Sequence, residues 1–242
     1  AIPDELATDI AISLASNTPR HKPRPQLLVD VSHLAVHDAQ SGIQRVVRSL
    51  LREMLTRVDT PFDIQPVQAR GDQGYTYARK FTARFLGLDV VVEDEPVDVL
   101  AGDVFLGLDL TSGIASAHES WFQHVRRIGA KVVFVVYDLL PNLAPQYFPA
   151  GVVGAAKRWV PLVARTADQA LCISRTVADE LTEWVARADL EDRLTPLKID
   201  YWPLGADIDL PDASPQDVDP VHTGALKRMN ERPSALMVGT IE

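Results

Sequence analysis

From about residue 26 onward, two patterns of apolar and polar positions alternate along the chain. Short apolar runs of strand length are followed by longer segments with apolar residues at i, i+3, i+4 and i+7, the spacing of a helix with one buried face. We expect strands at 27–32, 62–67, 103–108, 131–137, 169–173 and 197–202, and helices at 42–58, about 77–87, about 113–128, 151–166 and 175–188. Alternation of this kind predicts an α/β fold, a parallel sheet with helices on both faces.

The run KVVFVVYD at residues 131–138 is apolar at nearly every position, as expected of a central strand covered on both sides. In open sheets of this kind, ligands bind beyond the carboxyl ends of the strands. The segments that follow the strands are therefore the ones to inspect for a site: 32–41, 109–113, 138–145, Ser174 and 205–207.

The helix at 42–58 has one apolar face and a basic one. Ser41 and Gln44 have the spacing of a capping box, so we expect the helix to begin at Gly42 with free backbone N–H groups that suit a phosphate. Gly42 either lets a phosphate or sugar approach the backbone or serves a tight turn before a capped helix. Arg45 either contacts an anionic ligand or belongs to a solvated face with Arg48, Arg52 and Arg57.

Two aspartates follow directly on predicted strands. Asp138 ends the central strand, where a carboxylate can orient a hydroxyl or act as a base; alternatively it is a turn residue ahead of Pro141. Asp109 has the same geometry after the strand at 103–108. Ser174 is explained by N-capping of the helix at 175–188.

Other candidate chemistry is disfavoured. His33, His37 and Asp38 are close in sequence, but without a nearby cysteine or an HExxH spacing we expect a solvated polar loop and no metal. The chain has neither a GxGxxG fingerprint nor a P-loop, which argues against conventional dinucleotide dehydrogenases and P-loop kinases. The single cysteine, Cys172, lies in an apolar run and is expected to be a buried structural thiol.

Composition narrows the class further. A net charge of −9 over 242 residues argues against a general nucleic-acid binder. No apolar run reaches the roughly 18 to 20 residues that span a bilayer. We expect a cytoplasmic protein. Contact with the inner face of the membrane stays an open alternative, because the basic face of the helix at 42–58 suits anionic lipid.

Several motifs in order resemble one family. They are DVSHL with SGIQRVVRSLL, FLGLDL, VYDLLPNLAPQYFP, ADQALCISRTVADEL, WPLGADID and MVGTIE. Together they are similar to the N-terminal half of a retaining group 1 (family 4) glycosyltransferase, and more narrowly to the mannosyltransferase-like members of bacterial surface polysaccharide synthesis. The resemblance implies the GT-B architecture, in which two Rossmann-like domains face each other. The acceptor lies mainly on the first domain and the nucleotide-sugar donor mainly on the second.

The resemblance also implies roles for individual residues. Gly42 matches a glycine that approaches the donor phosphates or the transferred sugar, and Arg45 lies on the helix that flanks the acceptor. Asp138 matches the aspartate of a frequent His-Asp pair, and Tyr137 replaces the histidine. With a pKa near 10, a tyrosine is a poor base at neutral pH but can bond a sugar hydroxyl. The predicted site has Asp138 as catalytic residue and, as substrate-binding residues, Ser41, Gly42, Arg45, Asp109, Tyr137 and Gly205.

The domain organisation follows from the same reasoning. We expect an N-terminal extension at 1–25, a Rossmann-like acceptor-side domain at 26–206, an acidic linker at 207–232, and at 233–242 the first strand of a truncated donor-binding domain. The resemblance implies that the residues that neutralise the leaving diphosphate lie beyond residue 242, so this chain alone should transfer sugar poorly.

The expected function is transfer of a sugar from a nucleotide-sugar donor to a glycan or lipid-linked saccharide, without a further cofactor. The alternative is a non-catalytic Rossmann-like module that binds a nucleotide or glycan. The sugar, the nucleotide and the oligomeric state stay open.

Overall fold

The computed structural model describes residues 24–37, 41–71, 74–110, 112–188 and 195–205, and, further on, 224, 227–229, 231 and 233. The chain divides into two compact units, Ala1–Pro203 and Leu204–Glu242. The predicted extension at 1–25 lies outside the described residues except for its last two. The predicted linker at 207–232 and terminal strand at 233–242 lie almost wholly outside them, so these boundaries stay predictions.

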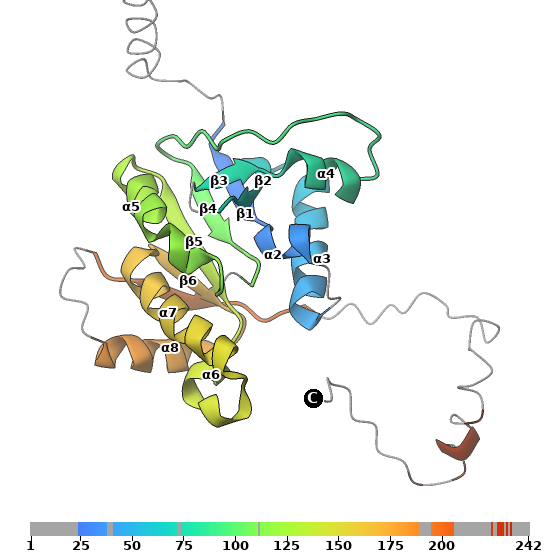
Figure 1. The fold of residues 1–242 in the computed structure, drawn as a ribbon, viewed down its shortest axis with the longest axis vertical. Helices are drawn as coiled ribbons and strands as arrows, with labels where there is room; N and C mark the ends of the chain where they lie inside the picture. Colours follow the sequence, from blue (N-terminus) through green and yellow to red (C-terminus); the bar gives the residue numbers. More distant parts are fainter. Residues whose placement is uncertain are drawn as a thin grey trace, which may run out of the picture. The chain divides into compact units, whose positions relative to one another are not determined.

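A seven-stranded sheet forms the centre of the first unit, in the order β3-β2-β1-β4-β5-β6-β7 (Figure 1). Its strands are β1 (Gln26–Asp30), β2 (Asp63–Ala69), β3 (Tyr75–Tyr77), β4 (Val104–Gly107), β5 (Lys131–Val136), β6 (Gln169–Cys172) and β7 (Lys198–Tyr201). Neighbouring strands are parallel except for β3, which pairs antiparallel with β2 at the edge. The strand order reverses between β1 and β4, and such a switch point leaves a crevice at the carboxyl ends of the strands.

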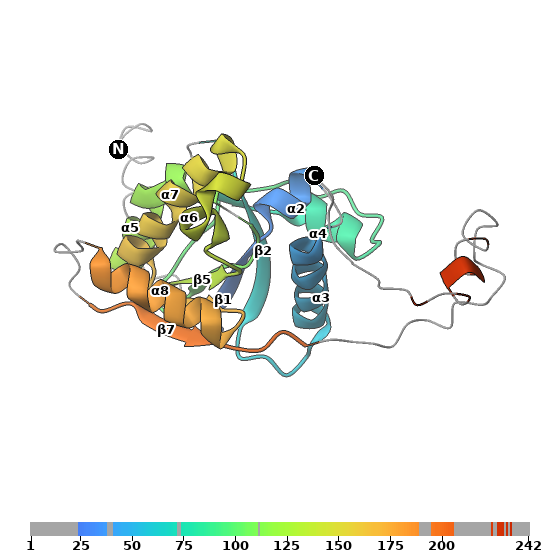
Figure 2. The ribbon, with the colours of Figure 1, turned by 90° about the horizontal axis from the view of Figure 1, so that it is seen from below.

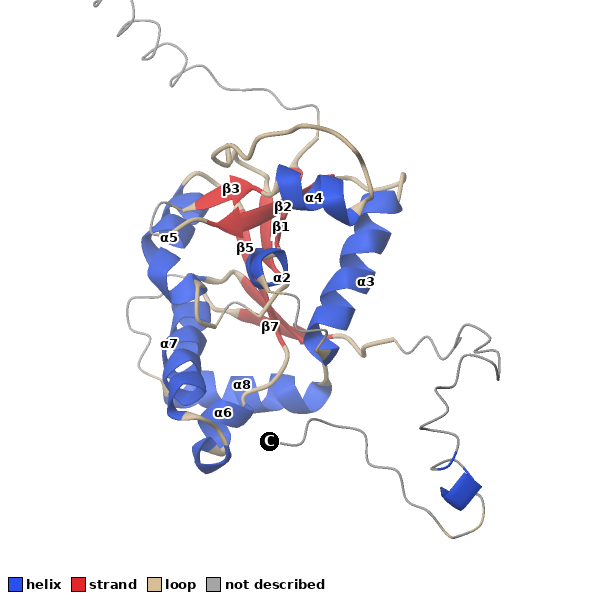
Figure 3. Cartoon of the chain, turned by 45° about the vertical axis from the view of Figure 1, so that its right-hand side comes forward, coloured by secondary structure: helices blue, strands red, loops and turns tan. Residues whose placement is uncertain are grey.

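Helices cover both faces of this sheet. They are α2 (Ser32–Val36), α3 (Gly42–Thr56), α4 (Arg79–Phe85), α5 (Glu119–Arg127), α6 (Leu140–Leu143), α7 (Ala150–Thr166) and α8 (Arg175–Arg187), with short 3-10 turns η1 (Ala115–His118) and η2 (Pro145–Tyr147). Helices α3 and α4 lie on one side, and α5, α7 and α8 on the other (Figures 2 and 3). The predicted fold class, a Rossmann-like sheet covered on both faces, is confirmed.

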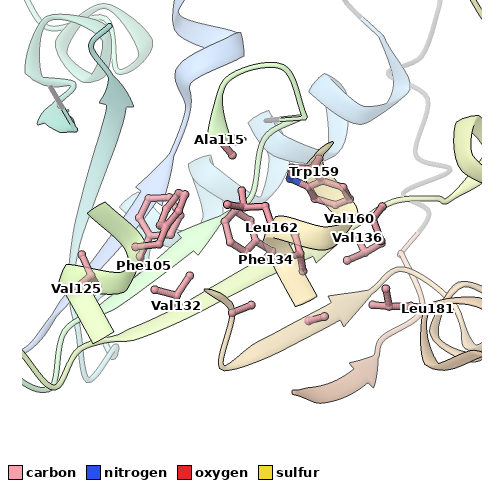
Figure 4. Close-up of a cluster of buried hydrophobic side chains, with 14 of the residues drawn as sticks. Phe105, Ala115, Val125, Val132, Phe134, Val136, Trp159, Val160, Leu162 and Leu181 are labelled. Atoms are coloured by element: carbon pink, nitrogen blue, oxygen red, sulfur yellow. The ribbon is translucent and has the colours of Figure 1, made fainter. Parts of the chain in front are cut away.

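Each face has its own core. On the side of α5, α7 and α8, Phe105, Phe122 and Phe134 are fully buried, and Trp159 of α7 packs beside them (Figure 4). On the side of α3, Val47 and Leu51 pack in a second cluster of strand residues. Strand β5 contributes to both clusters and is buried from its second residue to its last, so the prediction of a central strand is confirmed.

Two short elements differ from the sequence-based expectation. The helix expected from about residue 77 begins only at Arg79, because Tyr77 is the last residue of a short strand, β3. Tyrosine and threonine suit a strand, and Tyr75 is anchored by the rings of Phe105 and Trp121. The expected polar loop after β1 is partly helical, because Ser32–Val36 forms α2. A strand or helix this short depends on tertiary contacts rather than on its own periodicity.

Candidate functional site

A pocket of about 200 Å³ lies at the carboxyl ends of β4 and β5, next to the point between β1 and β4 where the strand order reverses. Strand β5 leads into Tyr137 and Asp138, and β4 leads into Asp109, so three of the predicted site residues line one pocket. Ile43 of the first turn of α3 also lines it, which brings the start of that helix to the same place. Helices α6 and α7 form the opposite wall.

Asp109 is a buried, structural carboxylate as well as a pocket residue. It is 1% exposed; its Oδ2 accepts a hydrogen bond from the Leu34 backbone N–H at 2.6 Å, and its Oδ1 accepts one from the Leu110 N–H at 2.7 Å. The first bond joins α2 to the loop after β4. Asp109 therefore shapes the site by fixing two neighbouring segments.

Tyr137 is fixed by a hydrogen bond to the backbone. Its hydroxyl donates to the Leu108 carbonyl at 2.8 Å. Burial raises the pKa of this phenol well above its usual range, and the nearby Asp109 carboxylate raises it further. Tyr137 is thus a neutral phenol at physiological pH, unsuited to acid-base chemistry, although its oxygen keeps the capacity to accept a hydrogen bond.

Of the two roles that the sequence left open for Asp138, the structure shows the one in the turn. Its Oδ1 accepts a hydrogen bond from the Leu140 N–H at 3.0 Å, so it does serve the turn before α6. The residue is also exposed and lines the pocket. Among the described acidic residues of the pocket, Asp109 is buried and bound to two backbone N–H groups, whereas Asp138 is accessible to a ligand.

The helix start at Gly42 is confirmed. Ser41 accepts a hydrogen bond from the Gln44 N–H at 3.3 Å, as a capping residue should. The reciprocal half of a capping box is absent from the described contacts, because the Gln44 side chain donates instead to the His37 carbonyl at 2.5 Å. A Cβ placed on Gly42 would meet no atom within 4 Å, so packing in this structure does not require glycine there.

The other predicted site residues lie outside the pocket lining. Arg45 is exposed on α3 and is not among the residues that border the pocket. Gly205 is exposed and belongs to the second unit. Their roles, like those of Ser41 and Gly42, stay predictions.

The remaining sequence-based interpretations concern the histidines, Ser174 and Cys172. Nδ1 of His33 lies 3.2 Å from Nε2 of Gln44, and within the described part of the chain no three His, Cys, Asp or Glu side chains gather as they would around a metal; Asp38 lies outside that part. Ser174 accepts from the Val177 N–H at 3.3 Å, which confirms it as an N-cap. Cys172 is fully buried, and burial raises the pKa of its thiol to about 12, so the prediction of a buried thiol is confirmed.

Sequence reasoning missed two polar residues of the pocket and one buried carboxyl group at the end of β1. Asn142 of α6 and Trp159 of α7 line the pocket, and each carries a buried polar atom without a hydrogen-bond partner in the described structure. Asp30 ends β1 and is fully buried, bonded to Ser32 and Tyr75. Asp30 had a usable signal, since it follows an apolar strand as Asp138 does; the other two became visible only when α6 and α7 were brought against the strand ends.

A doubly wound α/β sheet with a polar-rimmed pocket at its carboxyl edge fits a Rossmann-like glycosyltransferase domain. Comparison with curated proteins shows which glycosyltransferases this chain is similar to. The chain is 34% identical over 236 residues to a serotype-specific mannosyltransferase WbdA of Escherichia coli, which covers 96% of this chain and 28% of that protein. A second Escherichia coli protein of the same name is 34% identical over 220 residues, covering 90% of the chain and 26% of that protein.

These similarities confirm the predicted resemblance to a mannosyltransferase-type glycosyltransferase. The chain spans little more than a quarter of the length of these relatives. No protein-family profile and no solved structure matches it. None of the described helices is both long and apolar enough to cross a membrane.

Proposed function

We propose that this chain is the acceptor-side domain of a glycosyltransferase that moves a sugar, with retention, from a nucleotide-sugar donor to a glycan or lipid-linked saccharide. The observation that carries the proposal is the pocket at the ends of β4 and β5, with the exposed Asp138 carboxylate on its rim. The similarity to mannosyltransferases supports a hexose as the sugar. A GT-B arrangement, in which a second domain holds the donor, agrees with a chain that spans about a quarter of its relatives.

In this proposal Asp138 accepts a hydrogen bond from the attacking hydroxyl of the acceptor. The second oxygen of its carboxylate has this capacity while Oδ1 holds the turn before α6. A carboxylate at this place also stabilises the positive charge that develops on the sugar ring as its bond to the donor phosphate breaks. Tyr137, held neutral, orients the loop by its bond to Leu108 and takes no part in proton transfer.

The start of α3 is the proposed contact for the donor phosphates or the transferred sugar. Its N–H groups and the positive end of the helix dipole favour an anion. Ile43 places this turn beside the pocket, and the open space above Gly42 allows close approach to the backbone.

The test uses the full-length protein that contains this domain, assayed for transfer with a panel of nucleotide sugars. Gly42→Val should leave the melting temperature near that of the parent, because a Cβ at residue 42 meets no neighbour, but should greatly reduce transfer. Gly42→Ala is the matched control with a smaller side chain and an intermediate loss. No turnover with any donor, and no stabilisation by any nucleotide sugar, would contradict the proposal.

A second candidate is a non-catalytic module that binds a nucleotide or glycan. The fixed, neutral Tyr137 favours it, because no described group beside Asp138 offers an imidazole. Saccharide binding by the full-length protein without transfer from any donor would support this second candidate.

A further inference from the structure

Two buried polar atoms in the pocket wall have no hydrogen-bond partner among the described residues. Trp159 of α7 is 9% exposed, and its indole Nε1 is buried and unbonded. Asn142 of α6 has the same property at its side-chain oxygen Oδ1. Both residues line the pocket that Asp138 borders. Figure 4 shows Trp159 at the edge of the aromatic core, where it packs edge-on against Phe134 at 6.3 Å between ring centroids.

The two atoms have opposite hydrogen-bonding character. An indole N–H can only donate, and an amide oxygen can only accept. Native proteins rarely leave such buried groups without a hydrogen bond. We therefore expect a group of the ligand to hydrogen-bond to these two atoms of the pocket wall. A hydroxyl can accept from Trp159 and donate to Asn142 at the same time. An ionised phosphate or carboxylate oxygen can accept from the indole but has no proton to give the amide oxygen.

The charge of the lining points the same way. Among the described residues that line the pocket, Asp109 and Asp138 are acidic and none is basic. Two carboxylates and no cation repel an anionic ligand at short range.

The walls between these polar groups are apolar, with Phe148, Val152 and Val160 among them. A small pocket of mostly apolar wall and few polar atoms suits a compact ligand whose orientation those atoms fix.

We propose that this pocket binds a neutral sugar ring, one hydroxyl of which bridges Trp159 Nε1 and Asn142 Oδ1. A sugar ring has C–H groups on its faces for the apolar walls and hydroxyls on its rim for the polar atoms. The inference rests on the proposed function and deepens it, because it assigns the pocket to the sugar of the acceptor and leaves the donor diphosphate outside the pocket, at the start of α3. It also makes Asn142 and Trp159 specificity residues, which select the position of one hydroxyl.

The chain itself allows a direct test. It has four tryptophans, so its indole N–H signals in a nitrogen-proton correlation spectrum are few, and Trp159→Phe identifies the signal of Trp159. The probes are the neutral methyl glycosides of mannose, glucose and galactose, together with glucuronate and inorganic phosphate. A neutral glycoside should shift the Trp159 signal saturably, and glucuronate and phosphate should not. The signal of Trp121, which lies near Gly74 and does not line the pocket, is the internal control.

Two variants test the bridge itself. Trp159→Phe keeps an aromatic ring and removes the N–H, while Asn142→Ala removes the acceptor from a partly exposed residue and should fold normally. Each should weaken glycoside binding about tenfold, the effect of one lost hydrogen bond. Trp121→Phe should leave the affinity unchanged. A deoxy glycoside that lacks the bridging hydroxyl loses both hydrogen bonds, so it should bind the parent protein more weakly than the intact sugar binds either variant.

The outcomes separate this inference from the proposed function. If no neutral glycoside shifts the signal, if phosphate shifts it equally, or if both variants bind as the parent does, the inference is wrong, although transfer by the full-length protein would still stand. If glycosides bind as expected but the full-length protein transfers no sugar from any donor, the inference about binding holds and the proposed transferase activity fails.

Discussion

Folding strongly changes the ionisation of Asp30. It is fully buried, and burial raises the pKa of its carboxyl from 3.8 to about 7, although hydrogen bonds from Ser32 act in the opposite direction. Because the folded state holds this proton more tightly than the unfolded chain, the stabilising contribution is complete below about pH 4. It is lost as the pH rises to about 7.

We therefore predict that the free energy of unfolding falls between pH 4 and pH 7 at up to about 1.4 kcal/mol per pH unit from this group. Asp30→Asn resembles the protonated carboxyl and keeps an acceptor for Ser32, so it should flatten this part of the profile. Urea unfolding at a series of pH values measures the slope. Asp59→Asn, an exposed site paired with Arg57, is the control and should retain the decline; an unchanged slope in Asp30→Asn would refute the assignment.

At the residue level, the sequence predicted which residues line the pocket better than it predicted the hydrogen bonds that those residues make. The rule that ligands bind beyond strand ends found Asp109 and Asp138, and the family resemblance added Tyr137; all three line one pocket. It could not show that Asp109 and Tyr137 are bonded to backbone groups, because Leu34 and Leu108 carry no sequence signal for such bonds.

At the level of elements, Gly107 is constrained by the core. A Cβ placed there would lie 2.3 Å from Cδ1 of Phe134, which is fully buried in β5. We predict that Gly107→Ala lowers the free energy of unfolding by about 1 to 3 kcal/mol, the usual cost of overpacking. Gly151→Ala, near the start of α7 with no atom within 4 Å, is the matched control and should be neutral or stabilising by about 0.5 to 1 kcal/mol. Equal stabilities of the two variants in urea would contradict this account.

The long elements were predictable because each has one buried face or a continuous apolar run. The bounds of α3, α7 and α8 lie within two residues of the expected ones. Elements β3 and α2 were not, since each has five residues or fewer and is held by contacts from distant segments. The hydrogen bond from the Leu34 N–H of α2 to the Asp109 carboxylate is one such contact, and no local pattern encodes it.

At the scale of the molecule, an apolar surface adjoins the pocket. Leu140, Leu143 and Tyr147 are 50%, 50% and 77% exposed, and they flank Pro141 and Asn142, which line the pocket. This supports a lipid-linked acceptor whose apolar carrier rests on these side chains. We predict that Leu143→Ser combined with Tyr147→Ser raises the KM of the full-length protein for a lipid-linked acceptor about tenfold.

The same double variant should leave the KM for a water-soluble acceptor unchanged. Val91→Ser is the control, because Val91 is 99% exposed but lies in the segment after α4. Equal changes of KM for both acceptors would argue against contact with the lipid and against a site of action at the membrane face.

The most direct test of the central claim is the rate of transfer by full-length Asp138→Asn. Asparagine keeps the shape of the side chain and an acceptor for the Leu140 N–H, so the turn before α6 should persist, while the negative charge at the pocket is lost. We predict that kcat falls about a hundredfold or more while the melting temperature is retained. Asp179→Asn, an exposed acid on α8, should have the parental rate. A parental kcat in Asp138→Asn would rule out a catalytic role for this carboxylate.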